Sequence, residues 1–228
     1  MKLFIVKRSL LIALAVICAV GAVIGICAGV AAASTHGGDK VIVIDAGHGG
    51  VDAGVRGVNT STKESDINFA IAVYLRGYFT DAGFKVVMTR KNQGGLYGLA
   101  TSGFKMRDMK KRKQIIEESN ADMVISVHQN FCPIPSRRGG QVFYDGASES
   151  GKQLAESIQN SLNGMEQAVR QSSALTGDYY MLKCTKSPSV IVECGFLSNT
   201  EDEALLISKD YQKSIAFAIF KGAVAYYS

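Results

Sequence analysis

Two histidines and a glutamate in this chain have the types and positions expected of a metal site. His48 follows the apolar run Val41–Ile44 in a glycine-rich turn, and His128 follows a later apolar run. Glu64 opens a predicted helix after a glycine-bearing loop. Two histidines and one carboxylate can hold a zinc ion and leave a fourth position open for water. We therefore predict that His48, Glu64 and His128 bind one Zn²⁺ ion.

A second glutamate, Glu193, follows the apolar run Ser189–Val192. Zinc lowers the pKa of a coordinated water molecule toward about 7 and polarises a carbonyl group. A carboxylate that does not bind the metal is then needed to take a proton from the water and pass it to a leaving amine. We expect Glu193 to be this catalytic residue.

The residue types and spacing by themselves leave other kinds of site open. The chain has no HExxH motif, and a lone histidine at the end of a strand is more often a core residue than a ligand. Two histidines and a carboxylate also form the iron site of oxygenases, although those enzymes usually have all-β folds. The third histidine of the chain, His36, lies in a linker-like stretch. His48 and His128 therefore remain as the candidate ligands.

Apolar runs and amphipathic segments alternate along the chain and must position these side chains. The expected strands are Val41–Ile44, Phe84–Thr89, Ala121–Val127, Gln141–Tyr144, Tyr179–Lys183 and Ser189–Val192. The expected helices are a segment from Glu64 to near Gly83, and then Lys105–Ser119, Ser148–Asn163, Thr200–Ser208 and Tyr211–Tyr227. Strands that alternate with helices, and that are continuously apolar, indicate an α/β fold. We predict a mostly parallel twisted sheet of about six strands with helices on both faces, preceded by one N-terminal hydrophobic helix.

The ends of the predicted strands bring the candidate residues together. His48, His128 and Glu193 each stand just past such an end, and ligands of open α/β sheets bind beyond the carboxyl ends of the strands. We expect these residues to converge at one edge, with Glu64 returning to it. The glycine-bearing segment Gln93–Gly103 is expected to be a surface loop, with a substrate lid as the alternative.

The N-terminal segment predicts that the protein works outside the cytoplasm. Basic residues precede the uncharged run Leu10–Ala33, which as a helix is long enough to cross a bilayer. This arrangement keeps the N-terminus in the cytoplasm and the rest outside. The run ends in small residues that a signal peptidase could cut, so an uncleaved anchor and a cleaved signal peptide are both open. We divide the chain into a signal peptide or anchor at 1–33, a linker at 34–39 and a catalytic domain at 40–228.

The composition is that of an ordinary globular protein of 228 residues with a net charge of +5. The basic cluster Lys110–Lys113 predicts the solvated face of a helix rather than a nucleic-acid patch, and we expect no nucleic-acid partner. Beyond the N-terminal segment the cysteines are Cys132, Cys184 and Cys194, without CxxC spacing. We expect free thiols, with a Cys184–Cys194 bridge as the alternative.

Four motifs resemble those of the zinc-dependent N-acetylmuramoyl-L-alanine amidases of the Amidase_3 type. They are IDAGHGGVDAG at Ile44–Gly54, KES with Glu64, ADMVISVHQN at Ala121–Asn130 and VIVECGFLSN at Val190–Asn199. The motifs occur in the order found in the family, and the resemblance covers residues 40–228.

The resemblance implies a role for each residue that matches a motif. The first three motifs supply the metal ligands, here His48, Glu64 and His128, and the fourth supplies the catalytic glutamate, here Glu193. Arg112 matches a family arginine on the helix before the second histidine, and we give it a supporting role. The implied reaction is hydrolysis of the amide bond between the lactyl group of N-acetylmuramic acid and L-alanine in peptidoglycan.

Within the family, the chain is most similar to the CwlD-type amidases of spore-forming bacteria. Those enzymes act in cortex synthesis, on the way to muramic-δ-lactam, which germination enzymes recognise. A small enzyme on an insoluble polymer is also expected to use a protein partner at the membrane for placement or activation. The alternatives are a zinc peptidase that cuts the stem peptide and a non-catalytic peptidoglycan-binding protein.

Several residues in and beside the motifs depart from the family's pattern. Cys194 stands next to the predicted base, where an aliphatic residue or threonine is usual, and Gln129 and Phe131 replace small residues around the second histidine. Cys132 is close enough in sequence to approach the metal, where it would fill the open position. We expect Cys132 and Cys194 to be structural.

Overall fold

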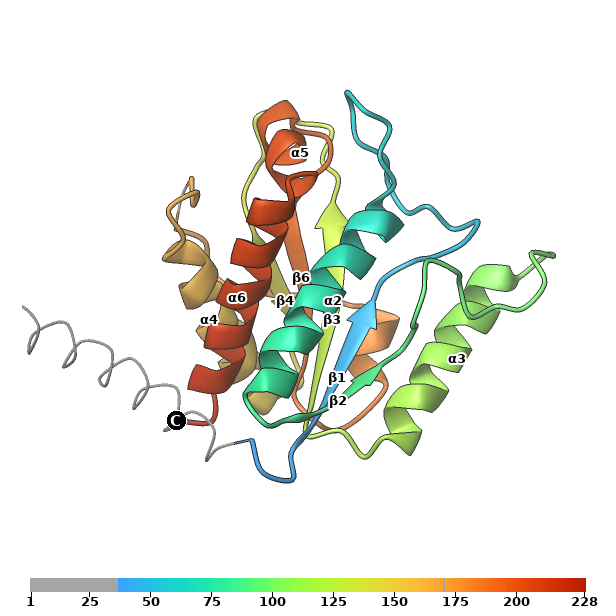
Figure 1. The fold of residues 1–228 in the computed structure, drawn as a ribbon, viewed down its shortest axis with the longest axis vertical. Coiled ribbons are helices and arrows are strands. Elements are labelled where there is room, and N and C mark those ends of the chain that lie inside the picture. The colour runs from blue at the N-terminus through green and yellow to red at the C-terminus, as the bar shows by residue number, and fades with distance from the viewer. Residues whose placement is uncertain (1–36, 170) are drawn as a thin grey trace, which may run out of the picture.

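A six-stranded sheet forms the centre of the protein, in the order β2-β1-β3-β6-β4-β5 (Figure 1). The computed structural model describes residues 37–169 and 171–228. The predicted signal segment at 1–33, with its hydrophobic helix, lies outside the described residues, as does the first half of the linker. Within the described ranges, none of the helices combines the length and the apolar character needed to cross a membrane. The boundaries at 33 and 39 therefore stay predictions.

The sheet is mostly parallel, as predicted. The parallel strands that follow one another across it are β2 (Lys85–Met88), β1 (Val41–Ala46), β3 (Met123–Asn130) and β6 (Ser189–Phe196). Next to β6, the strand β4 (Gln141–Tyr144) runs antiparallel, and β5 (Leu175–Thr176) pairs in parallel with β4 at the edge. The carboxyl ends of β1, β3 and β6 consequently lie side by side.

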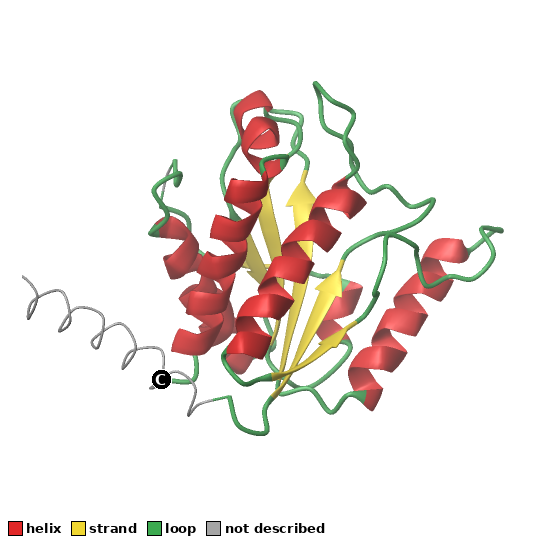
Figure 2. Ribbon diagram, in the orientation of Figure 1, coloured by secondary structure: helices red, strands yellow, loops and turns green. Residues whose placement is uncertain are grey.

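Helices cover both faces of this sheet (Figures 1 and 2). They are α2 (Glu64–Asp81), α3 (Phe104–Glu118), α4 (Glu149–Asn163), α5 (Thr200–Leu206), α6 (Lys209–Ala225) and the short 3₁₀ helix η1 (Tyr180–Lys183). Side chains of α2, α4 and α6 pack with Ile42 and Ile44 of β1, whereas side chains of α3 and η1 pack with Val43. Because side chains alternate along a strand, this division separates the two faces.

One predicted strand is wrong. Residues Tyr179–Lys183 were expected to be extended, but Tyr180–Lys183 form η1. Met181 and Leu182, which are adjacent, are both buried in this turn. A short apolar run does not distinguish a strand from a helical turn by its pattern, and the pattern gave no other signal here. The sixth strand is instead the two-residue β5, whose side chains are exposed.

Three other strands extend past their predicted ends, and the first of them, β1, continues from Ile44 to Ala46. β3 continues through His128 to Asn130, and β6 continues through Glu193 to Phe196. His128 and Glu193 therefore lie within the strands rather than just past them. The reason is that the two strands pair beyond their apolar parts, so that His128 stands opposite Glu193 in the ladder. A polar side chain does not end a strand whose backbone is still hydrogen-bonded.

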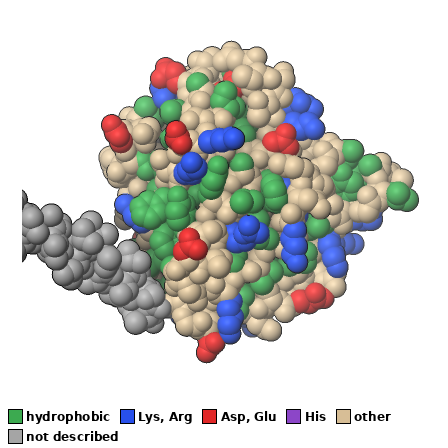
Figure 3. All heavy atoms as spheres, in the orientation of Figure 1, with side chains coloured by type: hydrophobic (Ala, Val, Ile, Leu, Met, Phe, Trp, Pro, Cys, Tyr) green, Lys and Arg blue, Asp and Glu red, His purple; other side chains and the backbone are tan. Residues whose placement is uncertain are grey.

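Charged side chains of both signs are interspersed over the face that α2 and α6 cover (Figure 3). Such mixing is typical of a solvated surface. The expectation that there is no nucleic-acid partner stays a prediction.

Candidate active site

Tight turns bring the predicted ligands together at the carboxyl edge of the sheet. His48 follows β1 with a φ of 59°, a left-handed conformation that non-glycine residues seldom adopt. A Cβ atom at Gly47 would overlap the ring of His128, and one at Gly54 would overlap the carboxylate of Glu64. The glycines of the motif are therefore needed because ligand side chains occupy the space beside them.

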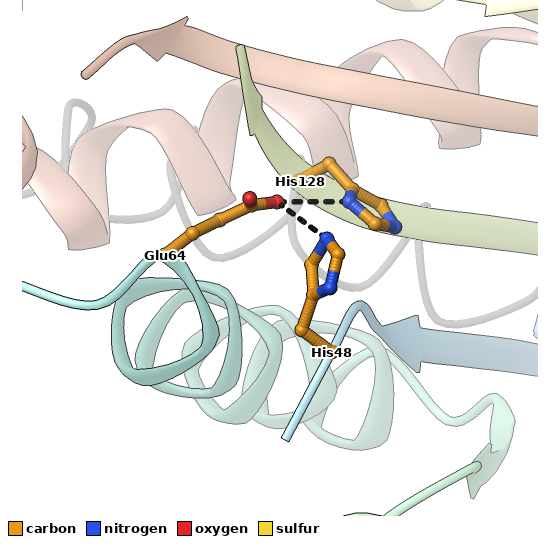
Figure 4. Close-up of side chains that lie close together, drawn as sticks. All are labelled: His48, Glu64 and His128. Atoms are coloured by element: carbon orange, nitrogen blue, oxygen red, sulfur yellow. Dashed lines mark hydrogen bonds and ion pairs between the residues drawn. The ribbon is translucent and has the colours of Figure 1, made fainter. Parts of the chain in front are cut away.

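The three predicted ligands form one cluster, in which the Glu64 carboxylate faces both histidines (Figure 4). Glu64 Oε1 lies 2.9 Å from His128 Nδ1 and 3.4 Å from His48 Nε2. One ligand atom from each residue lies within 4.8 Å of the other two, and the described residues contain no second group of this kind. Two imidazoles and one carboxylate aimed at a common point fit a divalent metal ion that prefers nitrogen and oxygen ligands. The structure thus brings together the three ligands that the sequence predicts.

The Glu64 carboxylate is held on both oxygens. Oε2 accepts a hydrogen bond of 2.9 Å from Val55 N, while Oε1 accepts bonds from Asn68 Nδ2 and Gln129 N, each 3.1 Å long. Burial favours the neutral acid, but the hydrogen bonds with His128 and His48 outweigh it and keep the pKa of Glu64 well below its usual range. The carboxylate is therefore charged and fixed in place, as a metal ligand must be.

A second carboxylate orients His48. Asp52 Oδ2 lies 2.8 Å from His48 Nδ1, so this nitrogen donates to Asp52 and leaves Nε2 facing Glu64. Burial of the ring opposes its positive charge, but Asp52 and Glu64 raise the pKa of His48 to about 9. The surrounding carboxylates therefore stabilise a cation at the cluster. Asp52 was not singled out from the sequence, although it stands four residues after His48 in the same motif.

Glu193 lies beside the cluster without joining it. It faces the same cavity of about 220 Å³ as His48 and His128, and its Oε2 atom is buried without a hydrogen-bond partner in the described part of the chain. Burial raises the pKa of Glu193 to about 7, and the negative charge of Glu64 adds to this effect. A carboxyl group that titrates near neutral pH, and that has an oxygen free, is suited to exchange protons with a bound molecule.

Arg112 supports the site from α3. Its guanidinium donates to Asp108 Oδ2, Asp45 Oδ1, Ala46 O and His48 O, with each distance 2.6 Å. Burial opposes the charge of Asp45, but Arg112 and the hydroxyl groups of Ser126 and Thr89 lower the pKa of Asp45 to about 2. The expectation that Lys110–Lys113 form one solvated face is thus wrong at Arg112, because the helix turns this residue toward the sheet.

A further arginine, Arg90, was not singled out from the sequence. It follows β2 and is buried, with Nε donating to Ala46 O at 2.9 Å and Nη2 donating to Ser65 O at 2.6 Å and to Gly47 O at 3.3 Å. No carboxylate lies within 4 Å of it among the described residues. Arg90 therefore ties the turn that carries His48 to the first turn of the helix that carries Glu64. Its position after a strand end was the available signal.

The cysteines near the site are not ligands in this arrangement. Cys132, Cys184 and Cys194 are free thiols, which rules out the Cys184–Cys194 bridge. Cys132 does not belong to the ligand cluster. Cys194 is fully buried in the core because adjacent residues of β6 face opposite sides of the sheet, and Glu193 faces the cavity.

Residues 42–225 match the family model described as N-acetylmuramoyl-L-alanine amidase, Amidase_3. The chain belongs to this family. The amidase is 34% identical over 193 residues to the germination-specific N-acetylmuramoyl-L-alanine amidase of Bacillus subtilis (strain 168). This alignment covers 83% of the present chain and 80% of that protein. It is therefore an enzyme that hydrolyses amide bonds of peptidoglycan.

Solved structures agree with this assignment. The CwlD amidase from Clostridioides difficile, solved in complex with the GerS lipoprotein, is similar with a TM-score of 0.79 and 37% identity. The alignment covers 82% of the amidase and 98% of that chain. The catalytic domain of CwlV from Bacillus (Paenibacillus) polymyxa var. colistinus gives a TM-score of 0.71 and 26% identity, covering 82% and 97% of the two chains. The α/β fold is therefore that of known amidases.

Proposed function

We propose that this amidase cuts the bond between the lactyl group of N-acetylmuramic acid and L-alanine, with Zn²⁺ held by His48, Glu64 and His128. The observation that carries the proposal is the cluster of these three ligands beside Glu193, a carboxyl group with an unpartnered oxygen in the same cavity. When bound, zinc supplies a Lewis acid that activates water and polarises a carbonyl group.

In this mechanism Glu193 carries the proton. Its ionised carboxylate accepts a proton from the attacking water, whose oxygen forms a bond to the lactyl carbonyl carbon. The protonated carboxyl group then gives that proton to the alanine nitrogen as the carbon–nitrogen bond breaks. A pKa near 7 supports both steps, because the group can hold and release a proton at neutral pH. Asp52 keeps His48 oriented throughout.

The test is a digest of purified peptidoglycan by residues 35–228 with added zinc, read by mass spectrometry. We expect free stem peptides that begin at L-alanine and glycan that carries bare lactyl groups. Cleavage between residues of the stem peptide would contradict the proposal in favour of a peptidase. Glu193→Gln should keep the fold and the bound zinc but lose turnover by about three orders of magnitude, a typical contribution of a general acid–base residue. Near-normal turnover by this variant would exclude the role given to Glu193.

We further propose a role in spore cortex maturation, in which stem peptides are removed on the way to muramic-δ-lactam. Similarity to the germination-specific amidase and to CwlD supports this role. Expression of the amidase in Bacillus subtilis that lacks its germination-specific amidase should restore muramic-δ-lactam to the cortex, whereas Glu193→Gln should not. Normal enzyme levels without the lactam would contradict the cortex role and leave the hydrolytic activity standing.

We also propose that the amidase works outside the cytoplasmic membrane, either anchored by its segment 1–33 or released after cleavage of that segment, and that it works with a protein partner there. The complex of CwlD with a lipoprotein supports the idea of a partner. Affinity purification of the full chain from membranes of the source cell should recover a second protein in a fixed ratio. Recovery of the amidase alone, with full activity on peptidoglycan, would count against the partner.

A further inference from the structure

The cavity beside the ligand cluster runs between two segments on the same face of the sheet. On one side, Tyr179, Tyr180 and Met181 come from the segment that includes η1. On the other side, Lys105 and Met109 come from the first turns of α3. A substrate bound at the cluster would therefore extend past a side chain that carries a positive charge.

Lys105 is placed at a short distance from the ligand cluster. Its Nζ lies 3.3 Å from Asp52 Oδ1, and the other oxygen of Asp52 lies 2.8 Å from His48 Nδ1. The Lys105 side chain is 66% exposed. An ammonium group has three donors, so the single contact with Asp52 leaves others available for a ligand.

Arg112 also lines the described cavity, but its guanidinium group is not available to bind a ligand. Arg112 is buried, and its donors are committed to Asp45, Asp108 and two backbone carbonyl groups. Among the described lining residues, Lys105 is thus the lysine or arginine that can bind an anion without breaking the support of the site.

The distance suits a carboxylate on the second residue after the scissile bond. An extended peptide advances about 3.4 Å per residue. The His48 ring and Lys105 Nζ are joined through the two oxygens of Asp52 by contacts of 2.8 and 3.3 Å, so they lie no further apart than an extended peptide of two to three residues reaches. In the peptidoglycan stem, the residue after L-alanine is a D-glutamate linked through its side chain, so its α-carboxylate is free.

We propose that Lys105 is a specificity-determining residue that binds the free α-carboxylate of the second stem residue. This inference rests on the proposed function, because it assumes that the scissile amide lies at the cluster. The ammonium group selects stem peptides in which this carboxylate is charged over those in which it is amidated. An exposed ion pair of this kind corresponds to roughly a fivefold preference.

The test compares two muropeptides that differ only in this group, one with D-glutamate and one with D-isoglutamine as the second residue. With zinc-loaded enzyme, we expect kcat/KM to be about fivefold higher for the D-glutamate substrate. Lys105→Met should cut both substrates at nearly equal rates, Lys105→Arg should keep the preference, and Lys105→Glu should reverse it. Lys110→Met is the matched control, because Lys110 is exposed on α3 but does not line the cavity.

Each outcome has a definite meaning. Equal rates on the two substrates with the unmodified enzyme, or the same preference in Lys105→Met, would overturn the subsite. A uniform loss on both substrates in Lys105→Met, with the preference kept, would show that Lys105 acts only by positioning Asp52. If the unmodified enzyme cuts neither substrate, the proposed function fails and the subsite fails with it.

Discussion

The cavity has a ligand side and an open side, which are built from different chemistry. On the ligand side, Asp45, His48, Arg112 and His128 line the cavity, and Glu64 and Arg90 lie behind them and complete the network. The open side comprises Lys105, Tyr179 and Tyr180. Glu64, Arg90 and Arg112 are buried and each makes three or more hydrogen bonds, whereas Tyr179 and Tyr180 are 39% and 37% exposed.

Because of this difference, the two sides should respond differently to amino-acid substitution. A buried charge that loses its partner destabilises the whole domain, because no water can replace the lost bond. An exposed side chain that is lost is replaced by water at little cost. Substitutions on the ligand side should therefore change stability and metal binding, while those on the open side should change substrate preference alone.

Removal of the metal ion is expected to have the largest effect on the ligand side. Dialysis against a chelator should abolish peptidoglycan hydrolysis, because the proposed reaction needs the cation that His48, Glu64 and His128 hold. Added Zn²⁺ should restore it. Far-ultraviolet circular dichroism should stay unchanged, since neither of the two apolar core clusters includes His48, Glu64 or His128. Full activity in protein shown to be metal-free by elemental analysis would contradict the metal-dependent mechanism.

Arg112→Gln should destabilise the protein by about 3–5 kcal/mol, because Asp45 and Asp108 would keep buried charges without their partner. Urea unfolding measures the change. Lys111→Gln is the control, since Lys111 is exposed on the same helix and contacts only Gln114 among the described side chains. A loss below 1 kcal/mol in Arg112→Gln would show that the buried network is not a source of stability.

Acid should lower the free energy of unfolding by about 2 kcal/mol through the protonation of Asp45, which pairs with Arg112. The pKa of Asp45 falls from 3.8 to about 2 in the folded protein, and one pKa unit corresponds to about 1.4 kcal/mol. A lowered pKa stabilises the folded state above the unfolded value, so this contribution is present above pH 4 and is lost as the pH falls through about 2. Carboxyl-carbon NMR should find the Asp45 pKa near 2, and a value near 3.8 would refute the pairing with Arg112.

Arg90→Lys should weaken metal binding by about tenfold, since lysine keeps the charge but cannot reach Ala46, Gly47 and Ser65 together. Competition with a zinc-binding dye measures the affinity. Lys91→Met, at the exposed neighbouring position, should leave it unchanged. If Arg90→Lys lowers the free energy of unfolding but keeps the zinc affinity, the arginine supports the fold without positioning the ligands.

The smallest effect is expected on the open side. Tyr180→Ala should raise KM by a few-fold and change the free energy of unfolding by less than about 0.5 kcal/mol, because the ring lines the cavity but is partly exposed. Steady-state kinetics and urea unfolding provide the two numbers. Phe217→Ala removes an aromatic ring of similar exposure from α6 and should leave KM unchanged. A large loss of stability in Tyr180→Ala would remove the contrast between the two sides.

Much of the site could be predicted from the sequence because its residues stand at strand and helix ends. The apolar runs before His48, His128 and Glu193 identified three neighbouring strands, and parallel strands bring their carboxyl ends to one edge. Glu64 opens α2 as expected. The types of these residues made a metal site with a nearby carboxyl group one of several possibilities, and the resemblance of the four motifs to the family then favoured it. Their roles in catalysis remain proposals for the experiments above.

Other features depend on contacts that no local pattern encodes. Arg90 read as an ordinary basic residue in the chain, and only the match to a family arginine singled out Arg112. The packing of β2 and α3 against β1 is what turns both guanidinium groups toward buried carbonyl and carboxylate oxygens. The segment at Tyr180 forms a 3₁₀ turn, although its apolar run suited a strand equally well. Residue types at strand ends thus determine which chemistry is available, while burial decides which charges are fixed and which stay free, because hydrogen-bond partners and exclusion of water arise only when distant segments pack.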